Sequence, residues 1–158
     1  MVTQLQHLSE QEIDLVYRAP ILTSILISGA EGPINDRKIN AAIEFAKKEV
    51  KEARALMYDL YLEISEDMEQ KIQETIRLYP EDPPQRSQQI LHELEKLNEI
   101  LPKLDKSFAV VYYISLKNIA RKIARSTGGF LGIFGKISKA ERKYLGLDMI
   151  QDPLKIFR

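Results

Sequence analysis

The stretch "ILTSILISGAEGPINDRK", residues 21–38, decides the fold, because an apolar run ends in it at a glycine-proline bend. Glycine tolerates tight turns and proline lacks the N–H that a helix interior needs, so Gly32 and Pro33 predict a helix-to-helix corner. Beyond the bend, Asn35 has the short polar side chain that caps helix N-termini. Ile34, just before it, is placed for a hydrophobic staple against the new helix.

A second corner of the same design lies near the other end of the chain. The stretch "IARKIARSTGGFLGIFGKISKAE", residues 119–141, also runs from an amphipathic helix through small residues to Gly135, Ile137 and Ser138. A glycine, any residue, an isoleucine and a capping residue therefore occur twice at the same spacing. The repeat predicts a single domain over residues 1–158 made of two similar helical-hairpin halves, 9–80 and 84–158.

The first half reads as a series of helices. Ser9 and Glu12 have the spacing of a capping box, which marks a helix N-terminus. Pro20 cannot donate a backbone hydrogen bond, so we expect it to interrupt this helix and leave two nearly collinear pieces. Apolar residues at steps of three and four then predict one long helix over 39–64, with a possible restart at Ser65.

The second half follows the strongest breaker of the chain, "YPEDPP" at residues 79–84. Apolar positions predict a short helix over 90–101, a longer one over 108–123 and a final short one around Tyr144. No segment shows the sustained alternation of a β-strand. The sequence therefore predicts an all-α fold, a compact bundle of about six to eight helices.

Composition excludes several classes of function. The 158 residues include no cysteine, which rules out disulfides, thiolate nucleophiles and zinc held by cysteine. The N-terminus has no secretory pattern and no apolar run is long enough to span a bilayer, so we expect a soluble, cytoplasmic protein. Lys and Arg number 23, as do Asp and Glu, and this neutral balance disfavours a nucleic-acid partner.

The charges are nevertheless separated along the chain. Residues 117–143 contain eight cationic side chains against one acid, whereas residues 44–105 contain fifteen acids and nine bases. Lys117, Arg121, Lys122 and Arg125 lie opposite the apolar face of their predicted helix. They form either a solvated helix face or a site for an anionic partner, which would be an acidic membrane surface, nucleic acid or this protein's own acidic helices in a dimer.

The glycine-rich stretch 126–138 does not fit a phosphate-binding loop. Phe130 stands where the motif needs its first glycine, Ile137 stands where it needs Ser or Thr, and a helix precedes it in place of a strand. Its apolar residues either fold back onto the core or form an exposed patch for a partner. These residues are Phe130, Leu131, Ile133 and Phe134.

No catalytic group is specified by the sequence. His7 and His92 are the only histidines, and neither has the Glu three residues earlier that a di-iron bundle uses. Neither a Ser-His-Asp order nor a pair of catalytic carboxylates can be recognised. We therefore expect no enzymatic activity and no cofactor, apart from the divalent metal considered below.

The opening "LSEQEIDLVYRAPILTSILISGAEGPI", residues 8–34, and the second corner "GKISKAE", residues 135–141, resemble the TerB-like (tellurite-resistance-like) family of all-helical domains. This resemblance implies an interaction, scaffold or stress-sensing module, with a protein partner or a homo-oligomer. It also implies an acidic or metal-binding surface at the corners.

The corner acids only partly match this family. Glu31 stands where the family has Asp, and Lys38 replaces the expected Glu of the first corner. In the second corner Glu141 matches, but Phe134 replaces the Asp. The resemblance thus gives Glu31, Asp36 and Glu141 as candidate ligands of a divalent metal, which prefers several carboxylate oxygens.

Overall fold

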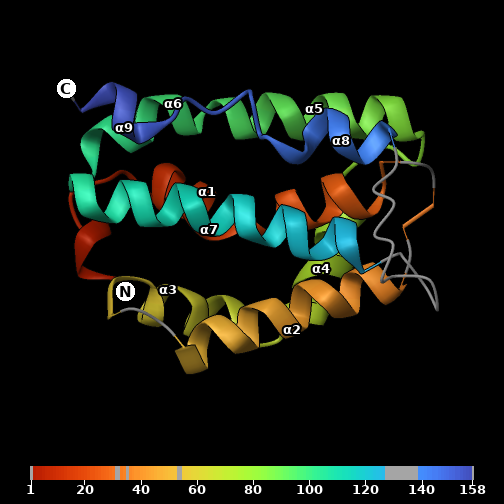
Figure 1. Cartoon of the computed structure of the whole chain (residues 1–158), viewed down its shortest axis with the longest axis horizontal. Helices are drawn as coiled ribbons and strands as arrows, with labels where there is room; N and C mark the ends of the chain where they lie inside the picture. Colours follow the sequence, from red (N-terminus) through yellow and green to blue (C-terminus); the bar gives the residue numbers. More distant parts are fainter. Residues whose placement is uncertain (1, 31–32, 35, 53–54, 127–138, 158) are drawn as a thin grey trace.

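The computed structural model describes residues 2–30, 33–34, 36–52, 55–126 and 139–157, and every regular element within these ranges is helical. The predicted all-α bundle is confirmed (Figure 1). The α-helices are α1 (Glu10–Ser28), α2 (Asp36–Glu52), α3 (Ala55–Ser65), α4 (Met68–Ile76), α5 (Pro83–Glu95), α6 (Leu97–Ile100), α7 (Lys106–Arg125), α8 (Lys139–Leu145) and α9 (Pro153–Ile156). Single 3-10 turns span Thr3–Leu5 and Leu101–Lys103.

Helix α1 is the centre of the bundle, because α2, α4, α5, α7 and α8 all pack against it. The predicted capping box starts it: the N–H of Glu12 donates to Ser9 Oγ at 3.2 Å, and the N–H of Ser9 donates to Glu12 Oε2 at 2.9 Å. From Ala19 onward every residue of α1 is buried. Such burial on all sides is expected of a helix that other helices surround.

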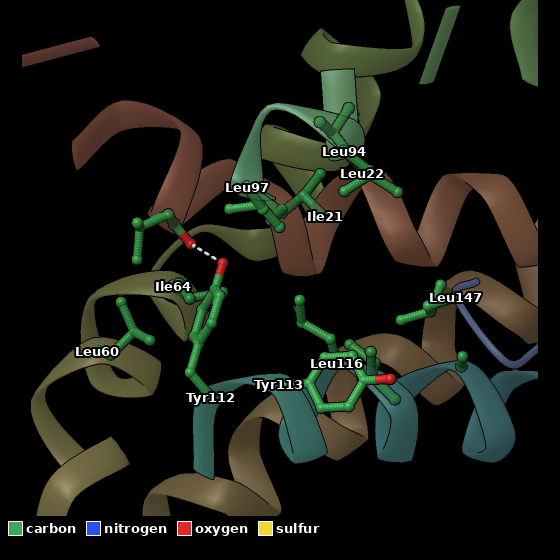
Figure 2. Packing of buried hydrophobic residues seen from close by; sticks show 14 of the residues in the cluster. Ile21, Leu22, Leu60, Ile64, Leu94, Leu97, Tyr112, Tyr113, Leu116 and Leu147 are labelled. Atoms are coloured by element: carbon green, nitrogen blue, oxygen red, sulfur yellow. Dashed lines mark hydrogen bonds between the residues drawn. The ribbon is translucent and has the colours of Figure 1, made fainter. Parts of the chain in front are cut away.

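The predicted interruption at Pro20 is wrong, since α1 continues through this residue to Ser28. Pro20 has no N–H to donate to the carbonyl oxygen of Val16 one turn earlier. The hydroxyl of Tyr112 on α7 donates to that oxygen instead, at 2.8 Å, and both groups are buried (Figure 2). A tertiary hydrogen bond thus replaces the one that proline removes, and the helix stays continuous.

The predicted long helix over 39–64 is also wrong, because the chain reverses between α2 and α3. The two helices pack along each other, with the rings of Phe45 and Tyr61 edge to face at a centroid distance of 6.0 Å. Both helices carry apolar residues at the same spacing, so periodicity alone cannot locate the reversal between them. Ser65 does end a helix, and α4 begins three residues later after Asp67 in the left-handed conformation, with φ 52°.

The C-terminus of α1 is capped by a buried arginine from α5. Arg86 is 5% exposed, and its Nη2 donates to the carbonyl oxygen of Gly29 at 2.9 Å. A Cβ at position 29 would lie only 2.3 Å from this Nη2, so a larger residue there would displace the guanidinium. The positive charge also lies at the negative end of the α1 dipole. Burial lowers the pKa of Arg86, although an arginine remains protonated.

The buried apolar side chains of α1 to α7 form one cluster, to which Leu147 and Ile150 near the C-terminus also belong. Figure 2 shows Leu22 of α1 close to Leu94 of α5 and Leu97 of α6, with Leu116 of α7 on the opposite side. Helices of both predicted halves therefore bury their apolar faces against the same helix, α1.

The two corners start their second helices at the same offset. Helix α2 begins four residues after Gly32, and α8 begins four residues after Gly135. The predicted capping residues Asn35 and Ser138 lie outside the described residues. The internal duplication into 9–80 and 84–158 stays a prediction, with this common offset in its favour.

Candidate interaction face on helices α7 and α8

Helix α7 is positioned by its N-cap and by its apolar face. Asp105 accepts hydrogen bonds from the N–H groups of Ser107 and Phe108, at 2.9 and 3.2 Å, and so starts the helix. Its buried side chains pack against α1, α2, α3 and the two C-terminal helices. This packing leaves only a narrow outer stripe of α7 in contact with water.

The C-terminal half of this stripe carries the predicted cations. Arg121, Lys122 and Arg125 are exposed, and Lys117 is half-buried with its ammonium 5.4 Å from the ring centroid of Tyr113. None of the four forms a salt bridge with another described residue. Their charges therefore remain available to a partner.

Helix α8 adds three more cations next to α7. It packs against α7 and α1, and Figure 1 places it near the C-terminal half of α7. Lys139, Arg142 and Lys143 are exposed on it. We call these cations of the two helices the cationic face, which consists of Lys117, Arg121, Lys122, Arg125, Lys139, Arg142 and Lys143.

The one acid of this region does not reduce the charge of the cationic face. Glu141 is 1% exposed, and its Oε2 lies 3.2 Å from the ammonium of Lys38, which is 3% exposed. Lys38 comes from the first turn of α2 and Glu141 from the first turn of α8. Each residue lies six positions after its corner glycine, so equivalent positions of the two corners meet in a buried ion pair.

The sequence pointed to both members of this pair but not to the pair itself. Lys38 stood out as the residue that replaces an expected acid, and Glu141 as the acid that the other corner retains. A carboxylate at position 38 would repel that of Glu141, so a lysine in place of the expected acid is the signal of such a contact. The contact is evident only when the fold places the first turns of α2 and α8 next to each other.

The candidate metal ligands are dispersed in the described structure. Asp36 is exposed at the start of α2, Glu141 is paired with Lys38, and Glu31 lies outside the described residues. Within the described ranges, no group of three or more His, Asp or Glu residues is arranged to hold a metal ion. A metal site on these three acids stays a prediction.

The predicted apolar patch cannot be placed. Phe130, Leu131, Ile133 and Phe134 all lie in 127–138, outside the described residues. The two histidines, in contrast, are exposed. His92 is 76% exposed at its side chain, and Nε2 of His7 lies 2.6 Å from the carbonyl oxygen of Lys103.

Sequence reasoning missed Arg18, the residue around which the surface grooves are arranged. Its Nη2 lies 3.3 Å from Glu93 Oε2 on α5, and its Nε lies 2.9 Å from Asp14 Oδ2 on its own helix. Open grooves of about 680 Å³ each adjoin the Arg18–Glu93 pair, one beside Tyr79 and one beside Ile100. A cation in a mostly apolar helix was the available signal, but its partner Glu93 lies 75 residues away along the chain.

A third hollow, of about 410 Å³, lies between α1, α3 and α4 and is lined in part by Tyr17, Glu63 and Lys71. Burial raises the pKa of Tyr17 to about 12, and the nearby carboxylate of Glu63 acts in the same direction. Lys71 donates to the backbone oxygen of Glu63 at 2.7 Å. The phenol thus stays protonated at neutral pH.

Comparison with protein-family models, with curated proteins and with solved structures gives no match to this chain. The resemblance to TerB-like domains therefore stays a prediction. Among the described helices, none combines the length and the apolar character required to cross a membrane.

Proposed function

We propose that this protein is a non-catalytic helical interaction module that contacts an anionic partner through its cationic face. The observation that carries this proposal is the cationic face of six exposed cations and the half-buried Lys117, because the one acid within residues 117–143, Glu141, is buried and paired with Lys38. A scaffold or stress-sensing role, as in TerB-like domains, agrees with this proposal.

The charges of the cationic face support binding of a partner at the protein surface. Exposed cations attract an oppositely charged surface and orient it during encounter, and salt weakens the attraction. Two buried tyrosine hydroxyls of the core, by comparison, are engaged inside the protein. The hydroxyl of Tyr61 donates to Ser115 Oγ, and that of Tyr112 donates to the Val16 oxygen.

The test compares partners that bind to the wild-type chain and to R121E/R125E, captured from the native cell. We expect the captured partners to be lost with this variant but kept with R77E/K155E, which reverses two exposed cations outside the cationic face. Equal capture by all three proteins would refute the proposal. Vesicles with and without acidic lipid, run in parallel, distinguish a membrane surface from a protein partner.

The alternative function is binding of a divalent metal by Glu31, Asp36 and Glu141. Metal binding requires the carboxylate of Glu141 to give up its ion pair with Lys38, because the ammonium of Lys38 lies beside this carboxylate. Calorimetry and thermal shift with calcium, magnesium and zinc test it on the wild-type chain. Binding that is lost in E141Q supports the alternative, and the absence of heat and thermal shift with all three metals removes it.

A further inference from the structure

Two segments of this chain each carry charges of one sign only. Residues 55–70 contain five acids and no base, whereas residues 106–126 contain five bases and no acid. The first segment consists of α3, the turn after it and the start of α4, and the second consists of α7 with its C-cap residue. A neutral chain thus presents two segments that are electrostatically complementary.

The outward side of α3 combines these acids with apolar side chains. Tyr58 is 44% exposed and Leu62 37% exposed, one helical turn apart. Asp59 and Glu66 are exposed along the same side and form no salt bridge with another described residue. We call these four residues, Tyr58, Asp59, Leu62 and Glu66, the acidic stripe.

The cationic face has a matching arrangement along α7. Ile114, 44% exposed, precedes Arg121 by seven residues, just as Tyr58 precedes Glu66 by eight. Seven or eight residues correspond to about 11 Å along a helix. When the two helices lie parallel with Ile114 against Tyr58 and Leu62, Arg121 lies level with Glu66, and Asp59 adds negative potential beside Ile114.

We infer that the cationic face of one copy docks on the acidic stripe of a second copy. This inference rests on the proposed function and names the anionic partner as the protein itself. Within one copy, α3 packs its buried side against α2 and α7, and Tyr61 bonds to Ser115 there, so both charged surfaces point to solvent. If each pair of copies forms one such contact, the contact is heterologous and joins copies head to tail, whereas two reciprocal contacts close a two-fold dimer.

The charge distribution favours this occupant over a membrane or a nucleic acid. The chain has no net charge, so its own acids cancel much of the attraction of the whole molecule to an extended polyanion, and salt limits the attraction of the cationic face to about 8 Å. A second copy offers acids on one helix beside exposed apolar residues. A second copy can therefore pair with the charges of the cationic face and also cover the exposed side chain of Ile114.

The experiment is sedimentation velocity on the full chain over a range of protein concentrations, at about 50 mM and about 500 mM salt. We expect self-association at low salt that weakens at high salt.

R121E/R125E and D59K/E66K each raise the dissociation constant at least about tenfold. The variant with all four substitutions, D59K/E66K/R121E/R125E, regains self-association because both charges are exchanged. R77E/K155E is the matched control and associates like the wild type.

Three outcomes overturn the inference: a monomeric wild-type chain at low salt, self-association that R121E/R125E leaves unchanged, or failure of the four-substitution variant to associate. Circular dichroism of each variant checks that it remains folded. If the wild type is monomeric but R121E/R125E still loses captured partners or acidic vesicles, the inference fails and the proposed function stands. If neither measurement responds to R121E/R125E, both fail.

Discussion

The carbonyl oxygen of Val16 shows how a single side chain keeps the central helix intact. Pro20 leaves this oxygen without a helical partner, and the Tyr112 hydroxyl supplies one at 2.8 Å. We expect Y112F to lower the free energy of unfolding by about 1–3 kcal/mol, because it leaves a buried carbonyl without a hydrogen bond. Denaturant unfolding of Y112F and of Y58F, whose ring is 44% exposed, gives the measurement and its control.

If the missing N–H of Pro20 is the reason for this cost, the effects of Y112F and P20A on the free energy of unfolding are not additive. In P20A the alanine N–H restores the helical bond to Val16, so the additional Y112F substitution costs less than it does in the wild type. A double-mutant cycle measures this difference. Additive effects of the two substitutions would contradict the explanation.

A second residue-scale prediction concerns Glu93 and pH. A hydrogen bond from Lys96, with the charge of Arg18, lowers the pKa of Glu93 below its ordinary 4.5. Since the folded pKa lies below the unfolded one, the contribution of Glu93 to stability is fully present above about pH 5. It disappears as pH falls through the folded pKa. E93Q should therefore flatten the decrease of the melting temperature between about pH 5 and pH 3.

The control for Glu93 is Glu95 on the same helix, whose side chain is 57% exposed. E95Q should leave the slope of melting temperature against pH close to that of the wild type. If E93Q and E95Q change this slope equally, the ion pairs of Glu93 do not account for the acid sensitivity.

At the scale of elements, the Lys38–Glu141 pair connects α2 to α8. Both side chains are almost completely buried, so removal of one leaves an uncompensated charge inside the protein. We expect K38M or E141L alone to destabilise the fold by about 3–5 kcal/mol. The double variant K38M/E141L should cost less than either single one, because it removes both charges and keeps apolar volume.

This prediction is measured by chemical denaturation of the three variants and the wild type. Hydrogen exchange of the α8 amides adds a local measurement, since release of this short helix would expose them. A double variant that is as unstable as the sum of the single ones would show that the two charges do not interact.

At the scale of the whole molecule, both predicted halves depend on α1. This helix packs against α2 and α4 of the first half and against α5, α7 and α8 of the second. A chain of residues 9–80 alone would expose the side of α1 that now contacts α5 and α7. We therefore expect neither 9–80 nor 84–158 to fold alone, as judged by helicity in circular dichroism and by the absence of a cooperative thermal transition.

Mixing the two fragments should restore helical signal, because the apolar surfaces that each exposes fit one another. A cooperative transition in either isolated fragment would instead show that a half carries its own core. The intact chain, which buries a single cluster, should unfold in one step.

Much of the fold was predictable from local pattern. The capping box at Ser9, the helix over 108–123 and the short helix around Tyr144 are all confirmed. These features depend on neighbours within one or two turns, which the sequence displays directly. The row of cations on α7 was predictable for the same reason, since helical spacing places it opposite the apolar face.

The sequence by itself thus determined the all-α class, the starting capping box of α1 and the charge of the α7 surface, because each follows from residues within a few turns of one another. Only the tertiary structure decided that α1 passes through Pro20, that the chain reverses between α2 and α3, and that Lys38 meets Glu141. The physical reason is that these outcomes depend on partners far away along the chain: Tyr112 bonds to a residue 96 positions earlier. Packing brings such groups together, and no local propensity encodes which of them will meet.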